Sequence, residues 1–347
     1  MAGRIPATIV TGFLGSGKTT LIRHLLNHAD GRRIALIVNE FGDLGVDGSI
    51  LQGCGLSDCA SGIVELSNGC ICCAVAEEFA PAMLELIERD IPPEHIIIET
   101  SGLALPQPLV RAFNWPQLRG KVTVDGVIAV IDGPALSEGR FANDHHAVEN
   151  QRRIDDSLDH DTPIAELFED QLTCADMAII TKSDLLDQAR MKAVSNQMEQ
   201  RTGAGVSVIV VEQGCIDPRL VLGLSVRAED ESLTVRDEDH HGHDEVHHDH
   251  DSFETFVATL PEVRCSKNLV AGIETMMKRH HLLRIKGFAA VKGRPMRLVV
   301  QAVGPRVSSY FDQELTTAEK NCTRLVVIGE AGLDQNAILR DLSFAVQ

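Results

Sequence analysis

A glycine-rich segment near the N-terminus carries the residue types that bind phosphate. Residues 12–19, the phosphate loop, read Gly-Phe-Leu-Gly-Ser-Gly-Lys-Thr and match the pattern GxxxxGK[ST]. An apolar run over residues 5–11 precedes them and a helical pattern over residues 20–26 follows, which is the context that the motif requires. Backbone N–H groups of the loop and the positive end of the helix dipole would then surround a β-phosphate. The residues predicted to line this site are Gly12, Gly15, Ser16, Gly17, Lys18, Thr19 and Thr20.

Two residues of the phosphate loop and one distant acid are candidates for phosphoryl-transfer chemistry. Lys18 would reach the β- and γ-phosphates, and the hydroxyl of Thr19 would hold Mg²⁺. Residues 96–102 read Ile-Ile-Ile-Glu-Thr-Ser-Gly, a buried strand that ends in an acid. This strand would place Glu99 beside the Mg²⁺ and the N–H of Gly102 near the γ-phosphate. We therefore take Lys18 and Glu99 as candidate catalytic residues, and Thr19 and Glu99 as candidate magnesium ligands.

A third segment has the residues to select the nucleotide base. An apolar strand over residues 177–181 ends at Thr181 and continues into Lys182-Ser183-Asp184. A carboxylate at Asp184 can accept N1–H and the 2-amino hydrogens of guanine, a pair that adenine does not offer. The aliphatic stem of Lys182 can cover the base. The tripeptide alone is a common pattern. Its position after the phosphate loop and the strand that ends at Glu99 predicts that the nucleotide is GTP rather than ATP.

Three thiols lie within four residues at Cys70, Cys72 and Cys73. Thiolates suit Zn²⁺, Cu⁺ or tetrahedral Co²⁺, and three protein ligands leave a fourth position open for metal exchange. Buried structural cysteine is the alternative, and it explains one or two thiols better than three together. Cys54 and Cys59 match no ligand spacing and are interpreted as loop cysteines.

A second cluster of possible metal ligands lies in an acidic segment. Residues 237–251 hold seven acidic side chains, six histidines and no Lys or Arg. They are either a loose binder of divalent ions or a solvated linker. The formal net charge of the whole chain is −18, which gives no electrostatic footprint for nucleic acid or for an anionic membrane surface.

The elements that must position these residues follow an α/β pattern. Short β-branched runs at residues 5–11, 34–39, 95–99, 122–131, 177–181 and 206–211 alternate with amphipathic stretches. Continuous apolar runs suit strands that are buried on both faces, so we expect a mostly parallel sheet with helices on both faces.

The pattern changes after the acidic segment. Strand-like runs at residues 253–260, 283–291, 296–302 and 324–328, with helical stretches at 267–280 and 334–344, indicate a smaller α+β domain on an antiparallel sheet. We therefore expect a nucleotide-binding domain over residues 1–227, an acidic, His-rich linker over 228–252 and a C-terminal domain over 253–347.

Length and composition favour a cytoplasmic globular protein. A chain of 347 residues predicts about two domains at ~150 residues each. No apolar run approaches the ~18 residues that a membrane-spanning helix needs. Pro6, Thr8, Thr11 and Gly12 interrupt the N-terminal apolar run before a signal peptide could form. The nine cysteines, an odd number, suit reduced thiols.

In this order along the chain, the motifs resemble the CobW family of metal-handling P-loop GTPases over nearly the whole sequence. Residues 38–42 (VNEFG) resemble the first switch segment of the family, and residues 65–73 (ELSNGCICC) resemble its hallmark. Residues 283–288 and 296–301 resemble its C-terminal domain. The resemblance implies a P-loop fold of the SIMIBI type and a GTPase that is slow without a partner.

The resemblance also assigns roles to single residues. It implies that Lys18 and Thr19 bind phosphate and Mg²⁺, that Glu99 belongs to the magnesium and catalytic network, and that Asp184 binds guanine. It implies that Cys70, Cys72 and Cys73 bind the cargo metal and that Glu40 is a metal or switch ligand. Thr181 departs from the family, which usually has Asn at this position, so we expect the loop to be held less tightly.

Within the family the sequence is similar to the cobalamin-biosynthesis subgroup, which favours Co²⁺ for insertion into a corrin ring and a recipient such as a cobaltochelatase. A zinc chaperone is the alternative. GTP with Mg²⁺ would order residues 39–42 and the turn with the three thiols, and hydrolysis would release the metal. A P-loop small-molecule kinase and a non-catalytic metal buffer are rival classes, and a homo-oligomer is left open.

Overall fold

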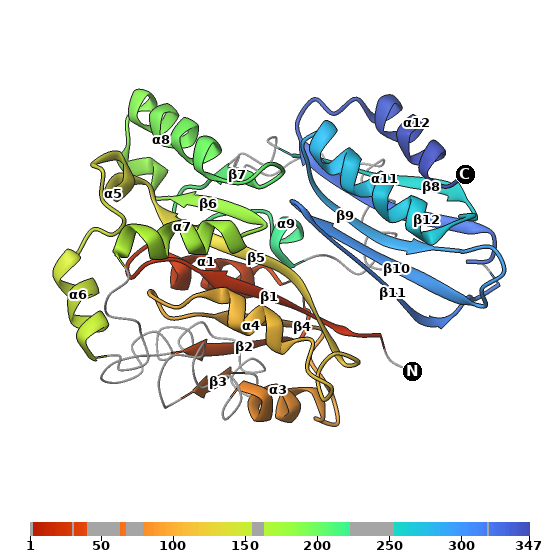
Figure 1. The fold of residues 1–347 in the computed structure, drawn as a ribbon, viewed down its shortest axis with the longest axis horizontal. Helices are drawn as coiled ribbons and strands as arrows, with labels where there is room; N and C mark the ends of the chain where they lie inside the picture. Colours follow the sequence, from red (N-terminus) through yellow and green to blue (C-terminus); the bar gives the residue numbers. More distant parts are fainter. Residues whose placement is uncertain are drawn as a thin grey trace, which may run out of the picture. The chain divides into compact units, whose positions relative to one another are not determined.

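The computed structural model of the chain describes residues 3–29, 31–39, 63–66, 79–154, 163–222, 253–317 and 319–347 (Figure 1). The chain divides into two compact units. The first comprises residues 4–221, and the second comprises residues 222–347 together with Gly3. Each unit has its own sheet and its own apolar core.

The first unit contains a seven-stranded sheet in which every strand pair is parallel. The strand order is β3-β2-β4-β1-β5-β6-β7. The strands are β1 (Ile5–Thr11), β2 (Ile34–Asn39), β3 (Ile63–Leu66), β4 (His95–Glu99), β5 (Val122–Asp132), β6 (Met177–Thr181) and β7 (Ser207–Val210). Every residue of β4, β5 and β6 is buried, as their uninterrupted apolar runs predict. The sequence missed β3, which has only four residues.

Helices cover both faces of this sheet (Figure 1). They are α1 (Lys18–Asn27), α3 (Ala80–Ile87), α4 (Pro106–Ala112), α5 (Gly133–Ser137), α6 (His145–Ile154), α7 (Ile164–Cys174), α8 (Gln188–Arg201) and α9 (Pro218–Leu222), with a short 3-10 turn η2 (Ser183–Leu185). On one face, α3 and α4 pack on alternate residues of β1, β2 and β4, and α7 and α8 pack on those of β5 and β6. The predicted α/β class is confirmed.

The second unit contains a five-stranded antiparallel sheet in the order β11-β10-β9-β12-β8. Its strands are β8 (Phe253–Pro261), β9 (Leu282–Ala289), β10 (Met296–Val303), β11 (Arg306–Glu314) and β12 (Cys322–Glu330). Helices α11 (Ser266–Arg279) and α12 (Gln335–Ala345) share one apolar cluster with the sheet, which confirms the predicted α+β domain. The sequence missed β11, because its residues are mostly polar and only partly buried. In the described part of the chain, no helix reaches the length and apolarity that crossing a membrane requires.

A buried polar contact joins three elements of the first unit. The hydroxyl of Thr8, in β1, lies 2.9 Å from His95 Nε2 and donates to the carbonyl of Val221, in α9, at 3.1 Å. A hydroxyl has one hydrogen and a carbonyl can only accept, so His95 must carry a proton on Nε2 and donate it to Thr8. Thr8 and His95 are at most 1% exposed, so water does not replace these partners.

This contact predicts a stability effect. Thr8→Val keeps the shape but removes the hydroxyl that pairs with a buried donor and a buried acceptor, which costs about 2 kcal/mol of unfolding free energy. The single tryptophan, Trp115, packs against the core of this unit, so its fluorescence during urea unfolding is the measurement.

Thr11→Val in the same strand is the matched control. The Thr11 hydroxyl is also buried, and it has no hydrogen-bond partner among the residues that the structure describes. Its loss is expected to leave stability unchanged or raised. Equal destabilisation by the two substitutions would contradict the assigned contact.

Candidate nucleotide-binding site

The carboxyl ends of neighbouring strands meet at one edge of the parallel sheet. The phosphate loop follows β1, Glu99 ends β4, Asp132 ends β5 and Thr181 ends β6. Strand β1 lies between β4 and β5. The strands β2 to β4 lie on one side of β1, and the strands β5 to β7 lie on its other side. Open α/β sheets bind ligands at this edge, where the strand order reverses. The structure thus brings the phosphate loop, Glu99 and the residues after β6 to one place.

Three glycines of the phosphate loop have a positive φ, at 138° for Gly12, 74° for Gly15 and 99° for Gly17. A Cβ on Gly12 would lie 2.2 Å from the carbonyl oxygen of Val130, in β5. A side chain at this position would therefore push the loop off the sheet. Gly17 is the N-cap of α1 and makes no side-chain cap hydrogen bond, and the N-terminus of a helix favours an anionic ligand.

The remaining loop residues fit a phosphate and its magnesium. Lys18 is 7% exposed, and its Nζ donates to the carbonyls of Gly12 at 2.8 Å and Phe13 at 3.2 Å, so the ammonium lies over the loop. The hydroxyl of Ser16 is buried and has no hydrogen-bond partner within the described residues. Thr19, in the first turn of α1, and Glu99 offer the oxygen donors that Mg²⁺ prefers. Thr20 is exposed.

An aromatic cluster packs against Phe13 and holds the phosphate loop in place. Phe13 is 2% exposed, and its ring centroid lies 6.2 Å from that of Phe141 and 6.0 Å from that of Phe168, in α7. The rings of Phe141 and Phe168 are 4.7 Å apart. The variable second position of the motif is therefore a packing residue in this chain.

The last residue of β6 and the three that follow it, which we call the β6 loop (residues 181–184), are bonded to the phosphate loop. The hydroxyl of Thr181 lies 2.6 Å from the carbonyl oxygen of Ser16 and 3.0 Å from that of Ile131. Nζ of Lys182 donates to the carbonyl of Gly15 at 2.7 Å. The hydroxyl that replaces the expected Asn thus has a direct contact with the phosphate loop, and Lys182 adds a second one.

A buried acid orients Lys182. Asp132 Oδ2 lies 2.5 Å from Lys182 Nζ, and the side chain of Asp132 is 1% exposed while that of Lys182 is 32% exposed. The other carboxylate oxygen, Oδ1, accepts from the N–H of Ala135 at 3.0 Å and so caps α5. Asp184 is exposed. Sequence reasoning missed Asp132, although an acid that ends a buried strand before Gly-Pro is a signal that could have found it.

The loop after β4 lies at the same edge. Glu99 is 5% exposed, and the N–H of Thr100 donates to the carbonyl of Val10 at 3.0 Å, which ties the end of β4 to β1. Gly102 is buried, and its carbonyl accepts a hydrogen bond from Gln171, in α7. Sequence reasoning did not identify Gln171.

A further loop at this edge was also missed. Val211 donates its N–H to Ile180 at 2.8 Å, and the chain then turns through Gln213 and Gly214, which have φ values of 49° and 74°. A Cβ on Gly214 would lie 3.1 Å from the backbone nitrogen of Leu21, in α1. The loop therefore packs between the end of β6 and α1, beside the β6 loop.

The predicted metal ligands Cys70, Cys72, Cys73 and Glu40 lie outside the described residues, as do Cys54, Cys59 and the His-rich segment. Within the described ranges, no group of three or more His, Cys, Asp or Glu side chains is arranged to hold a metal. The described cysteines include Cys265, the N-cap of α11. Backbone N–H groups of Asn268 and Lys267 lower the pKa of its thiol.

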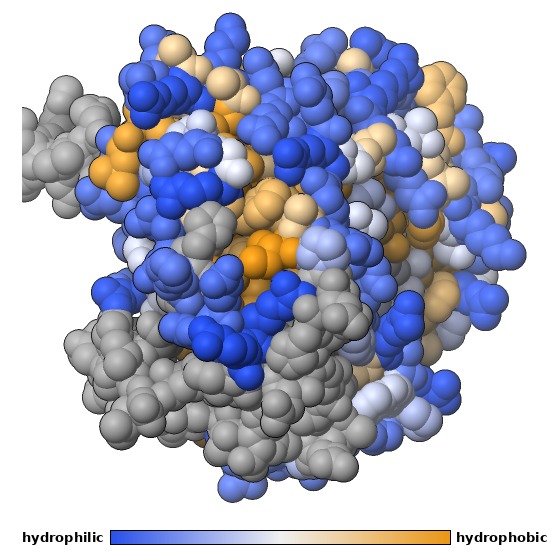
Figure 2. Space-filling model, turned by 60° about the vertical axis from the view of Figure 1, so that its left-hand side comes forward, coloured by the Kyte–Doolittle hydropathy of each residue, from blue (hydrophilic) through white to orange (hydrophobic). Residues whose placement is uncertain are grey.

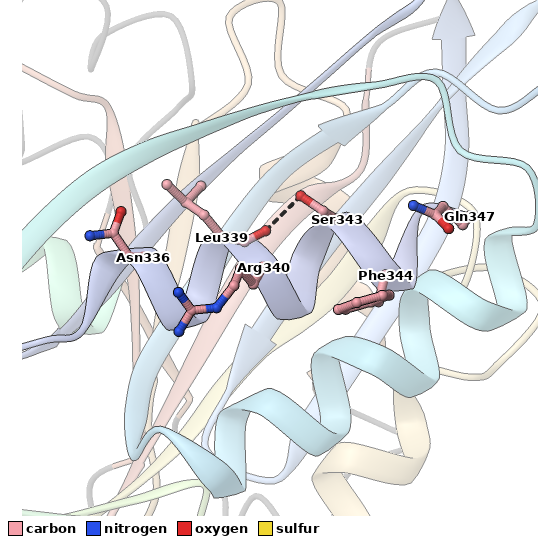
Figure 3. Close-up of a pocket in the computed structure, with 6 residues that line it drawn as sticks. All are labelled: Asn336, Leu339, Arg340, Ser343, Phe344 and Gln347. Carbon is pink, nitrogen blue, oxygen red and sulfur yellow. Dashed lines mark hydrogen bonds between the residues drawn. The ribbon is translucent and has the colours of Figure 1, made fainter.

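The second unit carries a shallow hollow of about 450 Å³ on α12. Its lining residues are Asn336, Leu339, Arg340, Ser343, Phe344 and Gln347 (Figure 3). Ser343 donates within the helix to the carbonyl of Leu339 at 2.7 Å, and Phe344 is 72% exposed. Figure 2 shows one face of the molecule, which is mostly hydrophilic with separate apolar patches.

Known proteins are similar to this chain over its whole length. The nucleotide-binding domain of CobW, HypB and UreG matches residues 6–216, and the cobalamin synthesis protein CobW C-terminal domain matches residues 253–346. A zinc chaperone CobW from Sinorhizobium is 50% identical over 340 residues, 97% of this chain and 96% of that protein. A zinc chaperone CobW from Pseudomonas aeruginosa is 48% identical over 347 residues, 99% and 92% of the two chains. A zinc chaperone YjiA from Escherichia coli is 31% identical over 334 residues, 94% of each.

The fold and the phosphate loop define a P-loop nucleotide-binding protein. With both domain matches in place, the chain belongs to the CobW/HypB/UreG family of GTPases. The resemblance seen in the sequence and the prediction of a GTPase are both confirmed.

The close packing of Gly12 against β5 predicts that a side chain at this position weakens nucleotide binding. Gly12→Ala places a methyl group against the Val130 carbonyl and is expected to weaken GDP binding by at least about 100-fold, which corresponds to about 3 kcal/mol. Titration with a fluorescent GDP is the measurement.

Gly31→Ala is the control for the cost of a positive φ alone. Gly31 has a φ of 75°, and no atom lies within 4 Å of the position of its Cβ. It is expected to lose about 1 kcal/mol of stability and to bind GDP normally. Normal GDP binding by Gly12→Ala would contradict the geometry described for the loop.

Proposed function

We propose that this chain is a GTP-dependent metallochaperone whose cargo is Zn²⁺. The observation that supports GTP binding is that the β6 loop is hydrogen-bonded to the phosphate loop at one edge of the sheet. The metal half is supported by the three clustered thiols and by the names of relatives that are about half identical over nearly the whole chain.

In this proposal each candidate residue acts on one part of GTP. Lys18 and the N–H groups of the phosphate loop neutralise the β- and γ-phosphates, and Gly102 donates its N–H to the γ-phosphate. Thr19 and Glu99 would hold Mg²⁺, and the ion would supply positive charge beside the β- and γ-phosphates. Asp184 accepts from guanine, and the stem of Lys182 covers the base.

The thiolates of Cys70, Cys72 and Cys73 hold the cargo, with Glu40 as a further ligand. Zinc and cobalt share ligand type and geometry, and a given site generally binds Zn²⁺ more tightly than Co²⁺. The relatives' names point to zinc, whereas the cobalamin-type resemblance favours cobalt and a cobaltochelatase as recipient. Cobalt therefore stays as the second candidate.

Nucleotide state and metal affinity are coupled in this proposal. Strands β2 and β3 are neighbours in the sheet, and in the sequence residues 40–42 come directly after β2 and the thiol segment comes shortly after β3. Contacts to the γ-phosphate order both segments, and their loss after hydrolysis releases the metal to a recipient protein. By linkage, the metal tightens GTP binding by the factor by which GTP tightens metal binding.

Base selection is tested with Asp184→Asn. The amide loses one of two acceptor oxygens and offers a donor instead, so GDP affinity is expected to fall about 100-fold while xanthosine diphosphate is bound better than GDP. Competition against a fluorescent nucleotide measures both. Asp187→Asn is the control, because Asp187 is an exposed acid that caps α8 three residues away. An unchanged preference for GDP in Asp184→Asn would exclude Asp184 as the guanine ligand.

Metal binding is tested by competition with a chelating dye, for Zn²⁺ and Co²⁺, with a slowly hydrolysed GTP analogue, with GDP and without nucleotide. We expect tighter binding with the GTP analogue and tighter binding of Zn²⁺ than of Co²⁺. Thiols must lose protons to bind metal, so affinity falls as the pH is lowered. Cys72→Ser and Cys73→Ser remove the tight site, whereas Cys265→Ser, which changes a low-pKa thiol elsewhere, leaves it intact.

Each rival proposal predicts a different result of the same experiment. Equal metal affinity with the GTP analogue and GDP would contradict the coupling. Loss of most metal uptake on deletion of residues 237–251 would favour a buffer that uses the His-rich segment. Phosphoryl transfer to a metabolite that is insensitive to chelators would favour a small-molecule kinase.

A further inference from the structure

One buried side chain of α7 bonds to the loop after β4. Nε2 of Gln171 lies 3.1 Å from the carbonyl oxygen of Gly102 and 3.1 Å from that of Ala104. An amide nitrogen carries two hydrogens, so each carbonyl receives one. Gln171 is 2% exposed, so water does not compete for these hydrogen bonds. The contact joins residues 69 and 67 positions apart in the sequence, and it therefore fixes tertiary structure rather than a local turn.

The loop that Gln171 holds has a defined peptide orientation. The N–H of Ala104 donates to the carbonyl of Ser101 at 3.1 Å, which closes a four-residue turn over residues 101–104. In the planar trans peptide between Ser101 and Gly102, the N–H of Gly102 points opposite to that carbonyl. The turn therefore directs the Gly102 N–H away from Ala104.

Two other contacts make α7 a common support for the site. Leu103, in the same turn, is 1% exposed and belongs to the apolar cluster that contains Phe13 and Phe168. Phe168 and Gln171 are both in α7, so one helix contacts both the phosphate loop and the loop that carries Gly102. A glycine at the centre of that loop has a low barrier to peptide rotation, so external hydrogen bonds are needed to keep one orientation.

We propose that Gln171 is a positioning residue through which the protein distinguishes GTP from GDP. Gln171 holds the Ser101–Ala104 turn so that the Gly102 N–H is aimed at the γ-phosphate before the nucleotide binds. The inference rests on the proposed nucleotide site and adds a residue that the site itself does not contain. GDP lacks the γ-phosphate, so the energy of this preorganised contact is gained with GTP alone.

The test is Gln171→Met, which keeps the length of the side chain and removes both donors. We expect the affinity for a slowly hydrolysed GTP analogue to fall about tenfold, since one well-placed hydrogen bond to a charged group is lost or disordered. GDP affinity is expected to stay within about twofold of wild type, and kcat for hydrolysis to fall with the GTP affinity. Gln171→Glu keeps the shape but puts oxygens against two carbonyls, so it is expected to lose at least as much GTP affinity as Gln171→Met.

Thr173→Val is the matched control. Thr173 is an exposed residue of the same helix, and its hydroxyl donates to the carbonyl of Glu169 at 2.8 Å, one turn earlier in α7. This variant is expected to leave both affinities unchanged.

Two results would overturn the proposal. If Gln171→Met lowers GTP and GDP affinity by the same factor, including a complete loss of both, Gln171 supports the whole domain rather than γ-phosphate recognition. If it changes neither, the two hydrogen bonds have no effect on nucleotide binding. Failure of the proposed nucleotide site would be visible in the wild-type protein as absent guanine-nucleotide binding, so the two failures are distinguishable.

Discussion

The bonding of the β6 loop to the phosphate loop is the constraint on which the rest of the site depends. Lys182 donates to Gly15 and pairs with the buried Asp132, and Thr181 lies against Ser16. A buried carboxylate is costly unless a cation compensates it, so Asp132 and Lys182 are held together in the fold. The segment that would select the base and the segment that would bind phosphate are therefore bonded to each other.

Helix α7 extends this structure to the loop after β4. Phe168 packs on Phe13 of the phosphate loop, and Gln171 donates to the carbonyls of Gly102 and Ala104. Both contacts are buried, so they persist without a ligand. The three loops that would surround a nucleotide are thus tied to one another by side chains to which the proposal assigns no phosphate contact. Preorganisation of this kind reduces the entropy that binding would otherwise cost.

Much of this arrangement could be predicted from the sequence, and the exceptions have physical reasons. Uninterrupted apolar runs identified the buried strands β4, β5 and β6, and glycine spacing identified the phosphate loop. Strand β11 was missed because its polar residues show no apolar face, and β3 because it has four residues.

Asp132 and Gln171 were missed for a different reason. The end of a buried strand marks Asp132 as a candidate, but its partner Lys182 and the partners of Gln171 lie 50 or more positions away, so only the packed structure reveals these contacts. The chemistry of Cys70, Cys72 and Cys73 was read from residue type and spacing, and it stays a prediction because these residues lie outside the described part of the chain. Cofactor-binding roles for Lys182 and Asp184 likewise remain predictions, now with a geometry to test.

The most direct measurement of the central claim compares GDP with inorganic pyrophosphate, which has no base and can touch only the phosphate loop. The double variant Asp132→Asn, Lys182→Met removes the ion pair without leaving one charge buried. If the two loops form one structure, the affinity of the double variant for pyrophosphate falls together with its affinity for GDP. The reason is that Gly15 has lost the hydrogen bond from Lys182. Weaker GDP binding with unchanged pyrophosphate binding would contradict the account, since Lys182 would then act on the base alone.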